Sequence, residues 1–105
     1  MLTDAPSRAK VQAGLTTARA EILALGVRRL ALFGSVRRDT ADAKSDIDLL
    51  VEFLPGQKTF DHFMELGDLL ERVLGYKVEL VTPESLSPTL KVHILADALD
   101  VVRAA

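Results

Sequence analysis

Two aspartates, Asp46 and Asp48, stand one residue apart at the head of an apolar run that ends at Phe53. Successive side chains of a β-strand point to opposite faces, so both aspartates would share one face and the apolar residues would fill the other. Asp is uncommon in strands, and two like charges on one face repel each other. Mg²⁺, which prefers oxygen ligands, would relieve that repulsion. The alternative is a solvated sheet face that holds no metal.

The dipeptide Gly34-Ser35 directly follows an earlier apolar run, Val27–Phe33. A strand that passes through Gly-Ser into a short helix would expose first-turn N–H groups, which together with the helix dipole favour an anion. The missing glycine side chain would let a phosphate approach the backbone, and the Ser35 hydroxyl adds a donor. The same dipeptide also fits an ordinary turn with a capping serine. Metal-holding carboxylates near a phosphate-binding turn indicate phosphoryl or nucleotidyl transfer.

A third acid, Glu79, lies in the apolar segment Val78–Val81, on the face opposite Val78 and Leu80. If this strand pairs with the second strand in matching register, opposed side chains lie about 5 Å apart at Cβ. Glu79 would then join the two aspartates. Such a cluster could hold two metal ions roughly 3.5–4 Å apart, which stabilise the attacking and leaving oxygens of an in-line displacement. An exposed strand glutamate fits the sequence equally well.

Three basic side chains flank the turn and the loop that follows it: Arg37, Arg38 and Lys44. One of them could neutralise phosphate charge, and arginine is suited to a bidentate grip. The others are expected to be solvated surface charges. His62 and His93 fall on expected helices without matching ligand partners, so we expect both at the surface or at its boundary.

The composition is typical of one globular domain, spanning residues 1–105, with 49% apolar and 27% charged residues. The net charge of −2 and the single Tyr without any Trp argue against nucleic acid as the main partner. No segment approaches the roughly 18 consecutive apolar residues of a membrane span, and the N-terminus lacks the pattern of a signal peptide. The absence of cysteine excludes disulfides and thiolate metal sites. A cytoplasmic location is therefore expected.

Hydrophobic periodicity predicts an α/β fold in which helices cover a small sheet. The expected elements, in chain order, are a helix over Ser7–Leu25, a strand over Val27–Phe33, a polar loop over Asp39–Ser45, a strand over Asp46–Phe53, a helix between the cap Thr59 and the stop Gly75, a strand over Lys77–Thr82, a helix over Pro88–Ala98 and a short strand near Val101-Val102. The apolar stripe of the longest helix is expected to comprise Phe60, Phe63, Met64, Leu70, Val73 and Leu74. The last helix is apolar enough for either a partner interface or the core.

Together these segments resemble the polymerase-beta-like nucleotidyltransferase superfamily, and more narrowly the minimal nucleotidyltransferase (MNT) proteins of bacteria and archaea. The likeness runs through Leu32–Arg37, Ser45–Phe53 and Gly75–Thr82. It implies the nucleotidyltransferase fold, a small mixed β-sheet with helices packed against it, and a Mg²⁺-dependent transfer of AMP from ATP. Many members of that family are encoded beside a HEPN-domain toxin and act as its antitoxin, some of them by adenylylating a tyrosine on it.

Carried over by position, the resemblance assigns Gly34, Ser35 and Arg37 to the triphosphate. It assigns Mg²⁺ binding and catalysis to three carboxylates, those of Asp46, Asp48 and Glu79. Two departures stand out. The third carboxylate is most often aspartate, so the longer Glu79 could weaken catalysis while metal binding survives. Arg38 stands where small residues are common, and it either crowds the turn or adds a phosphate contact.

The leading hypothesis from the sequence is an enzyme that adenylylates a protein hydroxyl, with a HEPN toxin as the partner. The alternative is an antitoxin that neutralises its partner by binding alone, with a degenerate catalytic site. Transfer to a small molecule is disfavoured, because a chain of this length leaves little room for a separate substrate-binding domain. The nucleotide preference, the modified residue and the oligomeric state stay open.

Overall fold

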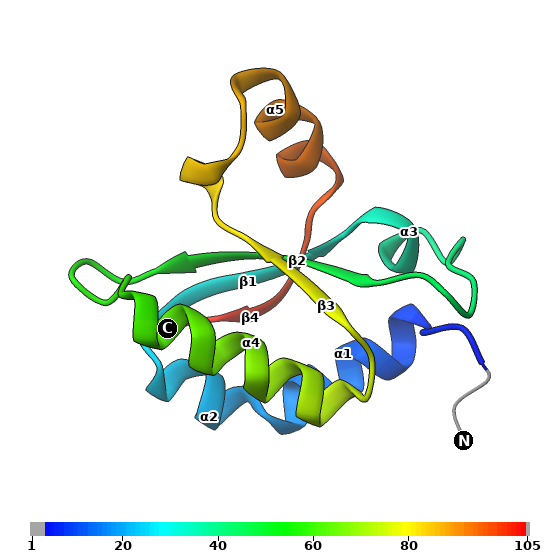
Figure 1. Cartoon of the computed structure of the whole chain (residues 1–105), viewed down its shortest axis with the longest axis horizontal. Helices are drawn as coiled ribbons and strands as arrows, with labels where there is room; N and C mark the ends of the chain where they lie inside the picture. The colour runs from blue at the N-terminus through cyan, green and yellow to red at the C-terminus, as the bar shows by residue number, and fades with distance from the viewer. Residues whose placement is uncertain (1–3, 105) are drawn as a thin grey trace.

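A four-stranded mixed sheet forms the centre of the computed structural model, which describes residues 4–104 (Figure 1). The strands are ordered β3-β2-β1-β4, and β1 pairs antiparallel with both β2 and β4. β2 pairs parallel with β3, and the crossover that a parallel pair requires runs through a helix. The strand bounds are β1 Val27–Phe33, β2 Ile47–Phe53, β3 Val78–Val81 and β4 Leu99–Arg103. The predicted small mixed sheet is confirmed.

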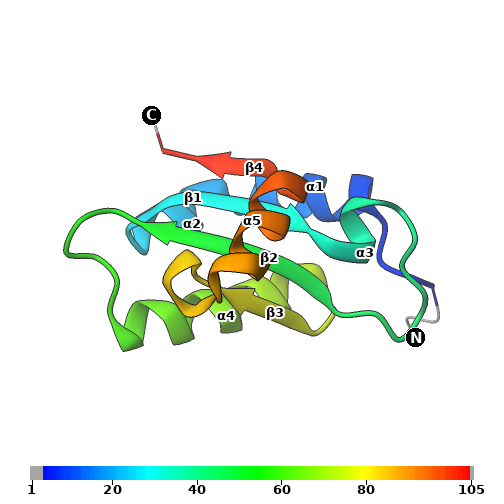
Figure 2. The same cartoon turned by 90° about the horizontal axis from the view of Figure 1, so that it is seen from above.

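The helices divide between the two faces of this sheet. One face is covered by α1 (Arg8–Thr17), α2 (Arg19–Ala24) and the crossover helix α4 (Phe60–Leu74) (Figure 1). The opposite face is largely open, and α5 (Pro88–Asp97) stands over its middle, reached through the short 3₁₀ turn Pro83–Ser85 (Figure 2). No helix within residues 4–104 combines the length and apolarity that crossing a bilayer requires.

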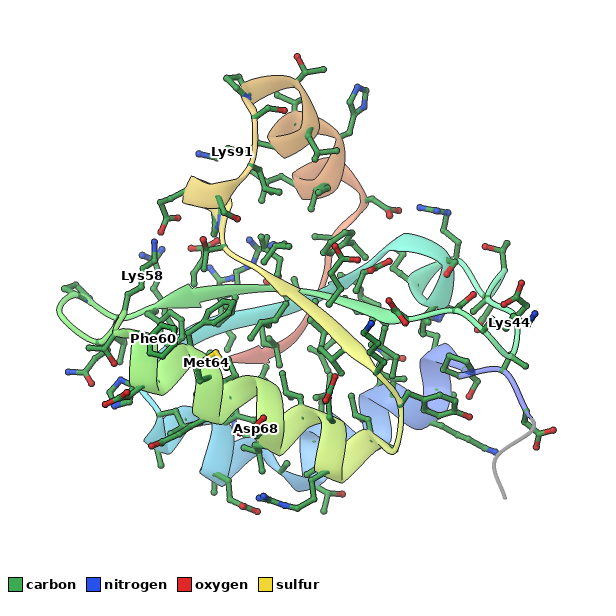
Figure 3. All side chains as sticks on the ribbon, viewed as in Figure 1. Lys44, Lys58, Phe60, Met64, Asp68 and Lys91 are labelled. Atoms are coloured by element: carbon green, nitrogen blue, oxygen red, sulfur yellow. The ribbon has the colours of Figure 1, made fainter. Side chains whose placement is uncertain are left out.

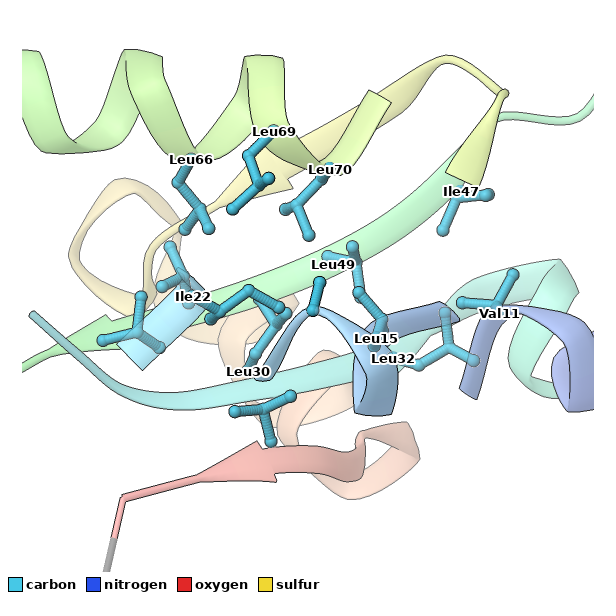
Figure 4. Packing of buried hydrophobic residues seen from close by; sticks show 14 of the residues in the cluster. Val11, Leu15, Ile22, Leu30, Leu32, Ile47, Leu49, Leu66, Leu69 and Leu70 are labelled. Atoms are coloured by element: carbon cyan, nitrogen blue, oxygen red, sulfur yellow. The ribbon is translucent and has the colours of Figure 1, made fainter. Parts of the chain in front are cut away.

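The hydrophobic core lies between the sheet and the helices of the covered face. Apolar side chains of β1 and β2 alternate toward these helices, which is the period of two that a half-buried strand requires. Figure 4 shows the packed residues, all nearly inaccessible to solvent: Val11, Leu15, Ile22, Leu30, Leu32, Ile47, Leu49, Leu66, Leu69 and Leu70. The alternate residues of β2, including Asp48, therefore lie on the open face.

The long first helix predicted over Ser7–Leu25 is wrong, because the chain forms two helices with a break at Ala18. Two threonine hydroxyls near the break, those of Thr16 and Thr17, donate back to main-chain carbonyls one turn earlier. Such back-bonding loosens and bends a helix. The apolar residues at helical spacing nevertheless keep facing the core, because the break leaves the helical phase nearly unchanged: Val11, Leu15, Ala18 and Ile22 are buried, and Leu25 is half-buried against them.

The predicted apolar stripe of α4 is partly wrong. Leu66 and Leu69, which were left out of that stripe, are buried beside Leu70, whereas Phe60 and Met64 keep 78% and 46% of their surface exposed (Figure 3). At 3.6 residues per turn Phe60 and Met64 lie on a side of α4 that the core does not cover. The predicted caps are confirmed: the Thr59 hydroxyl accepts the His62 N–H, and Gly75 ends the helix with φ of 75°.

A charged cluster ties three strands together on the open face, at the end far from Asp48. Arg29 of β1 donates to Glu52 of β2 at 2.9 Å and to Asp100 of β4. Asp100 also accepts from Arg103 at 2.7 Å. Only 17% of the Arg29 side chain is exposed, so its guanidinium group neutralises two carboxylates in a partly desolvated place.

We expect Arg29→Ala to lower the free energy of unfolding by about 1–2 kcal/mol, because it leaves Glu52 and Asp100 close together without a shared cation. Urea unfolding at pH 7 measures the change. Arg28→Ala is the matched control, since the neighbouring Arg28 side chain is exposed, and its cost should stay within about 0.5 kcal/mol. Equal costs for the two variants would contradict a stabilising role for the cluster.

Candidate active site

The turn at Gly34 brings the end of β1 against an acid of β2. Gly34 has φ of +77°, a left-handed conformation that side chains other than glycine rarely adopt. A Cβ at this position would collide with the carboxylate of Asp48. The chain then enters the four-residue helix α3 (Gly34–Arg37), which confirms the predicted short helix after Gly-Ser. Glycine is therefore required here both by the backbone and by the approach of Asp48.

The acids are brought together by the register of the sheet. Asp48 lies opposite Phe33 of β1 on one side and opposite Glu79 of β3 on the other, which is the matching register that Glu79 needs in order to lie beside Asp48. Asp46 immediately precedes β2, and both aspartates are half-buried while Glu79 is exposed. Burial, then the charge of Glu79 and a hydrogen bond to it, then the charge of Asp46 raise the pKa of Asp48 to about 6. Asp46 and Glu79 therefore each lie close enough to Asp48 to repel its charge.

The chemistry of this donor set fits a hard cation. Within the described range, residues 4–104, no three His, Cys, Asp or Glu side chains converge tightly enough to enclose a metal ion as they stand. Mg²⁺, however, is usually held by one or two carboxylates together with substrate phosphates and water, so a complete protein cage is not required. The assignment of Asp46, Asp48 and Glu79 as metal ligands stays a prediction.

The basic residues after the turn are oriented by a residue that the sequence analysis did not single out. Arg38 donates to the Asp97 carboxylate at 2.7 Å, so its side chain neither crowds the turn nor stands free as a phosphate contact. Arg37 Nε donates to the Asp97 main-chain oxygen at 2.9 Å. Lys44 is exposed in the loop between α3 and β2 (Figure 3). Of the three predicted basic residues, the two arginines are therefore the ones held beside the turn.

Asp97, the last residue of α5, also accepts the Gly34 N–H at 3.0 Å across 63 positions of sequence. No local motif marks such a residue. The only signal available was a carboxylate at the C-terminal end of an expected helix, where the helix dipole disfavours negative charge. The histidines behave as predicted, since the His62 ring contacts the main chain of Gln57 and His93 is exposed.

A hollow of about 350 Å³ lies beside the acids, between α4 and the free edge of the sheet. Phe63 and Met64 of α4 line one wall, and Glu79 and Leu80 of β3 line the other. Glu79 thus borders this hollow and also pairs with Asp48 in the sheet. An extended segment lying along the edge of β3 would reach the acids from this side.

Two relatives share most of the chain. A candidate protein adenylyltransferase of Methanocaldococcus jannaschii is 43% identical over 81 residues, which cover 77% of this chain and 86% of the relative. Protein adenylyltransferase MntA of Thermococcus cleftensis is 37% identical over 76 residues, which cover 70% of this chain and 74% of the relative. The family described as "Nucleotidyltransferase domain" matches residues 15–101, a region that contains β1, β2, β3 and the start of β4.

Solved structures agree with this assignment. A candidate minimal nucleotidyltransferase is 36% identical and superposes with a TM-score of 0.71. The matched region covers 88% of this chain and 89% of the chain in that structure. The MNT antitoxin in complex with a tri-AMPylated Shewanella oneidensis HEPN toxin is 21% identical, with coverage of 85% and 72% and a TM-score of 0.56, a likeness of fold alone. The chain therefore belongs to the nucleotidyltransferase domain family, and it is a nucleotidyltransferase of the minimal type.

Proposed function

We propose that this protein transfers AMP from Mg·ATP to a hydroxyl group of a partner protein, and that the partner is a HEPN toxin held inactive in this way. The observation that carries the proposal is the placement of Asp48 beside both Glu79 and the Gly34–Ser35 turn, on the open face of the sheet. The relatives named protein adenylyltransferases support AMP as the transferred group and a protein as the acceptor. The MNT antitoxin complex supports the class of partner.

In this reaction the donors of the Gly34–Ser35 turn that Asp97 leaves open, together with Arg37, would bind the triphosphate. The acids Asp46 and Asp48 would hold Mg²⁺, which when bound neutralises part of the phosphate charge. The acceptor hydroxyl would attack the α-phosphorus in line, so that a new O–P bond forms while the bond to pyrophosphate breaks. The attacking oxygen loses its proton, and exposed Glu79 would accept it. Catalysis would then depend mainly on positioning and charge neutralisation.

Mixing the protein with its partner, Mg²⁺ and α-labelled ATP tests this function directly. We expect label on the partner, located by mass spectrometry, and at least a hundredfold loss of the labelling rate in Asp46→Asn/Asp48→Asn, since changing only a hydrogen-bond partner of a metal ligand already costs roughly 10–100-fold. The matched control is Asp61→Asn/Glu65→Gln, which removes the same charge from exposed positions of α4 that do not line the hollow.

Each other outcome of this experiment assigns a different function. A stable complex that silences the partner without labelling it identifies an antitoxin that acts by binding alone. A labelled small product formed without any protein partner identifies a small-molecule transferase. Label that persists in Asp46→Asn/Asp48→Asn contradicts the assignment of the acidic cluster as the site.

Glu79→Gln tests the third carboxylate separately. We expect it to lower kcat by about 10²–10⁴-fold, the usual worth of a general base, while the dissociation constant of Mg·ATP changes little. Steady-state labelling and calorimetry measure the two quantities. If kcat is unchanged, Glu79 is an exposed strand residue without a role in the reaction.

The raised pKa of Asp48 predicts an unusual dependence of stability on pH. The unfolded chain releases this proton near pH 4, whereas the folded protein holds it up to about pH 6. The stabilising contribution of protonated Asp48 is therefore present below about pH 4 and is lost as the pH rises to 6. In metal-free buffer at pH 7, Asp48→Asn should be about 1–2 kcal/mol more stable than the wild type, since solvent screens part of the shift.

Urea unfolding from pH 4 to pH 7 in the presence of a chelator measures this effect. The decline in stability between pH 4 and 6 should be smaller in Asp48→Asn than in the wild type, and Asp68→Asn on α4 serves as the control for loss of one charge. The repulsion argument is wrong if Asp48→Asn is less stable than the wild type at pH 7.

A further inference from the structure

Asp97 joins the C-terminal end of α5 to the proposed triphosphate turn through three contacts. Its Oδ2 accepts the N–H of Gly34 at 3.0 Å and Nη1 of Arg38 at 2.7 Å. Its main-chain oxygen accepts Nε of Arg37 at 2.9 Å. Its side chain is 26% exposed, so these contacts are only partly screened by solvent. A single residue therefore orients the first residue of the turn and both arginines that follow it.

The position of this carboxylate is electrostatically unfavourable for α5 taken alone. Asp97 stands at the negative end of the helix dipole, where a carboxylate costs roughly 0.3–1 kcal/mol. The Gly34 N–H and the Arg38 guanidinium group supply the compensating positive charge. A residue chosen only to end or anchor α5 would not need to be acidic, so the acidity of Asp97 has its explanation in the turn.

The contacts also decide which main-chain donors of the turn stay open to an anion. The Gly34 N–H is occupied by Asp97, so the donors available to a triphosphate begin at Ser35, in the first turn of α3. On its other side Gly34 faces Asp48. The turn is thus held between two carboxylates, Asp48 from β2 and Asp97 from α5.

The main chain of Asp97 is fixed, so its carboxylate could leave the turn only by a side-chain rotation that gives up the bonds to Gly34 and Arg38. Its main chain is tied to Arg37, and two residues later Leu99 already pairs with Leu32 in the sheet. Moving the Asp97 main chain would therefore require both the end of α5 and the start of β4 to open. The geometry favours a permanent support of the turn over a carboxylate that triphosphate displaces.

We propose that Asp97 is a positioning residue for triphosphate binding, which acts by fixing the Gly34–Ser35 turn and the guanidinium groups of Arg37 and Arg38. The inference rests on the proposed function, because it assumes that this turn binds the triphosphate. Asp97 itself does not contact the nucleotide; it determines where the turn and Arg37, which would bind the triphosphate, are placed.

The test measures Mg·ATP affinity by calorimetry and KM and kcat by labelling of the partner. Asp97→Ala should raise the dissociation constant and KM for ATP about tenfold, with a smaller change in kcat. Asp97→Asn keeps an acceptor for the Gly34 N–H but loses the charge, so it should weaken binding about threefold. Loss of folded protein alone would lower the active fraction without changing the dissociation constant or KM for ATP.

Asp100→Ala is the matched control, since Asp100 is also a carboxylate bonded to two arginines but lies at the other end of the open face. Its dissociation constant for Mg·ATP should stay within about twofold of the wild type, roughly 0.4 kcal/mol. Thermal melting checks that each variant is folded. If Asp97→Ala does not fold, Asp97→Asn decides, and an unchanged affinity in that variant overturns the proposal.

The outcomes separate this inference from the proposed function. Weaker ATP binding in Asp97→Ala, together with no label on the partner from the wild-type protein, supports the inference and overturns the protein-adenylylating function. Normal labelling with equal ATP affinity in Asp97→Ala and Asp100→Ala overturns the inference alone. Tighter ATP binding in Asp97→Ala also overturns it, because Asp97 would then be an obstacle to the triphosphate. A wild-type protein that binds no Mg·ATP overturns both.

Discussion

Burial of one face of β2 is the constraint on which the rest of the molecule depends. Ile47, Leu49 and Val51 are completely buried against the helices of the covered face. Each such side chain contributes about 1.5–3 kcal/mol, so a one-residue slip of register would cost far more than the repulsion between neighbouring carboxylates. The slip would also bury Asp48 and Glu52. The core therefore determines that Asp48 faces the open side, and parallel pairing with β3 then places Glu79 beside it.

The open face carries charge at both ends, and only one end is balanced within the described residues. At the far end Arg29 neutralises Glu52 and Asp100, which makes a structural cluster. At the near end Asp48 meets Glu79, and mutual repulsion contributes to raising the pKa of Asp48 to about 6. Only the charge of Arg38 opposes this rise, and an acidic cluster that the fold neutralises in part is the arrangement expected where a cation and a charged substrate bind. The contrast between two ends of one sheet face therefore points to the site more strongly than either acid alone.

The features that the sequence predicted are those that depend on neighbours in the chain or on a period of two. Thr59 and Gly75 delimit α4 because a cap acts within one turn, and alternation in two strands predicts that Asp48 and Glu79 share a face, although the register that pairs them comes from the structure. The break at Ala18 depends on side-chain hydrogen bonds that compete with the helix. The contact between Gly34 and Asp97 joins residues 63 positions apart, and nothing in a local pattern encodes it.

The parts of the site differ in how firmly they are held. The acids are fixed by the hydrophobic core, and Gly34 is fixed by its left-handed backbone and by the lack of room beside Asp48. The arginines, in contrast, depend on Asp97 through contacts that solvent partly reaches, and pairs of that kind contribute only about 0.2–1 kcal/mol each. Salt screens such pairs but not a buried core. The turn is therefore the part of the site whose geometry responds most to ionic conditions, while the acids beneath it stay in register.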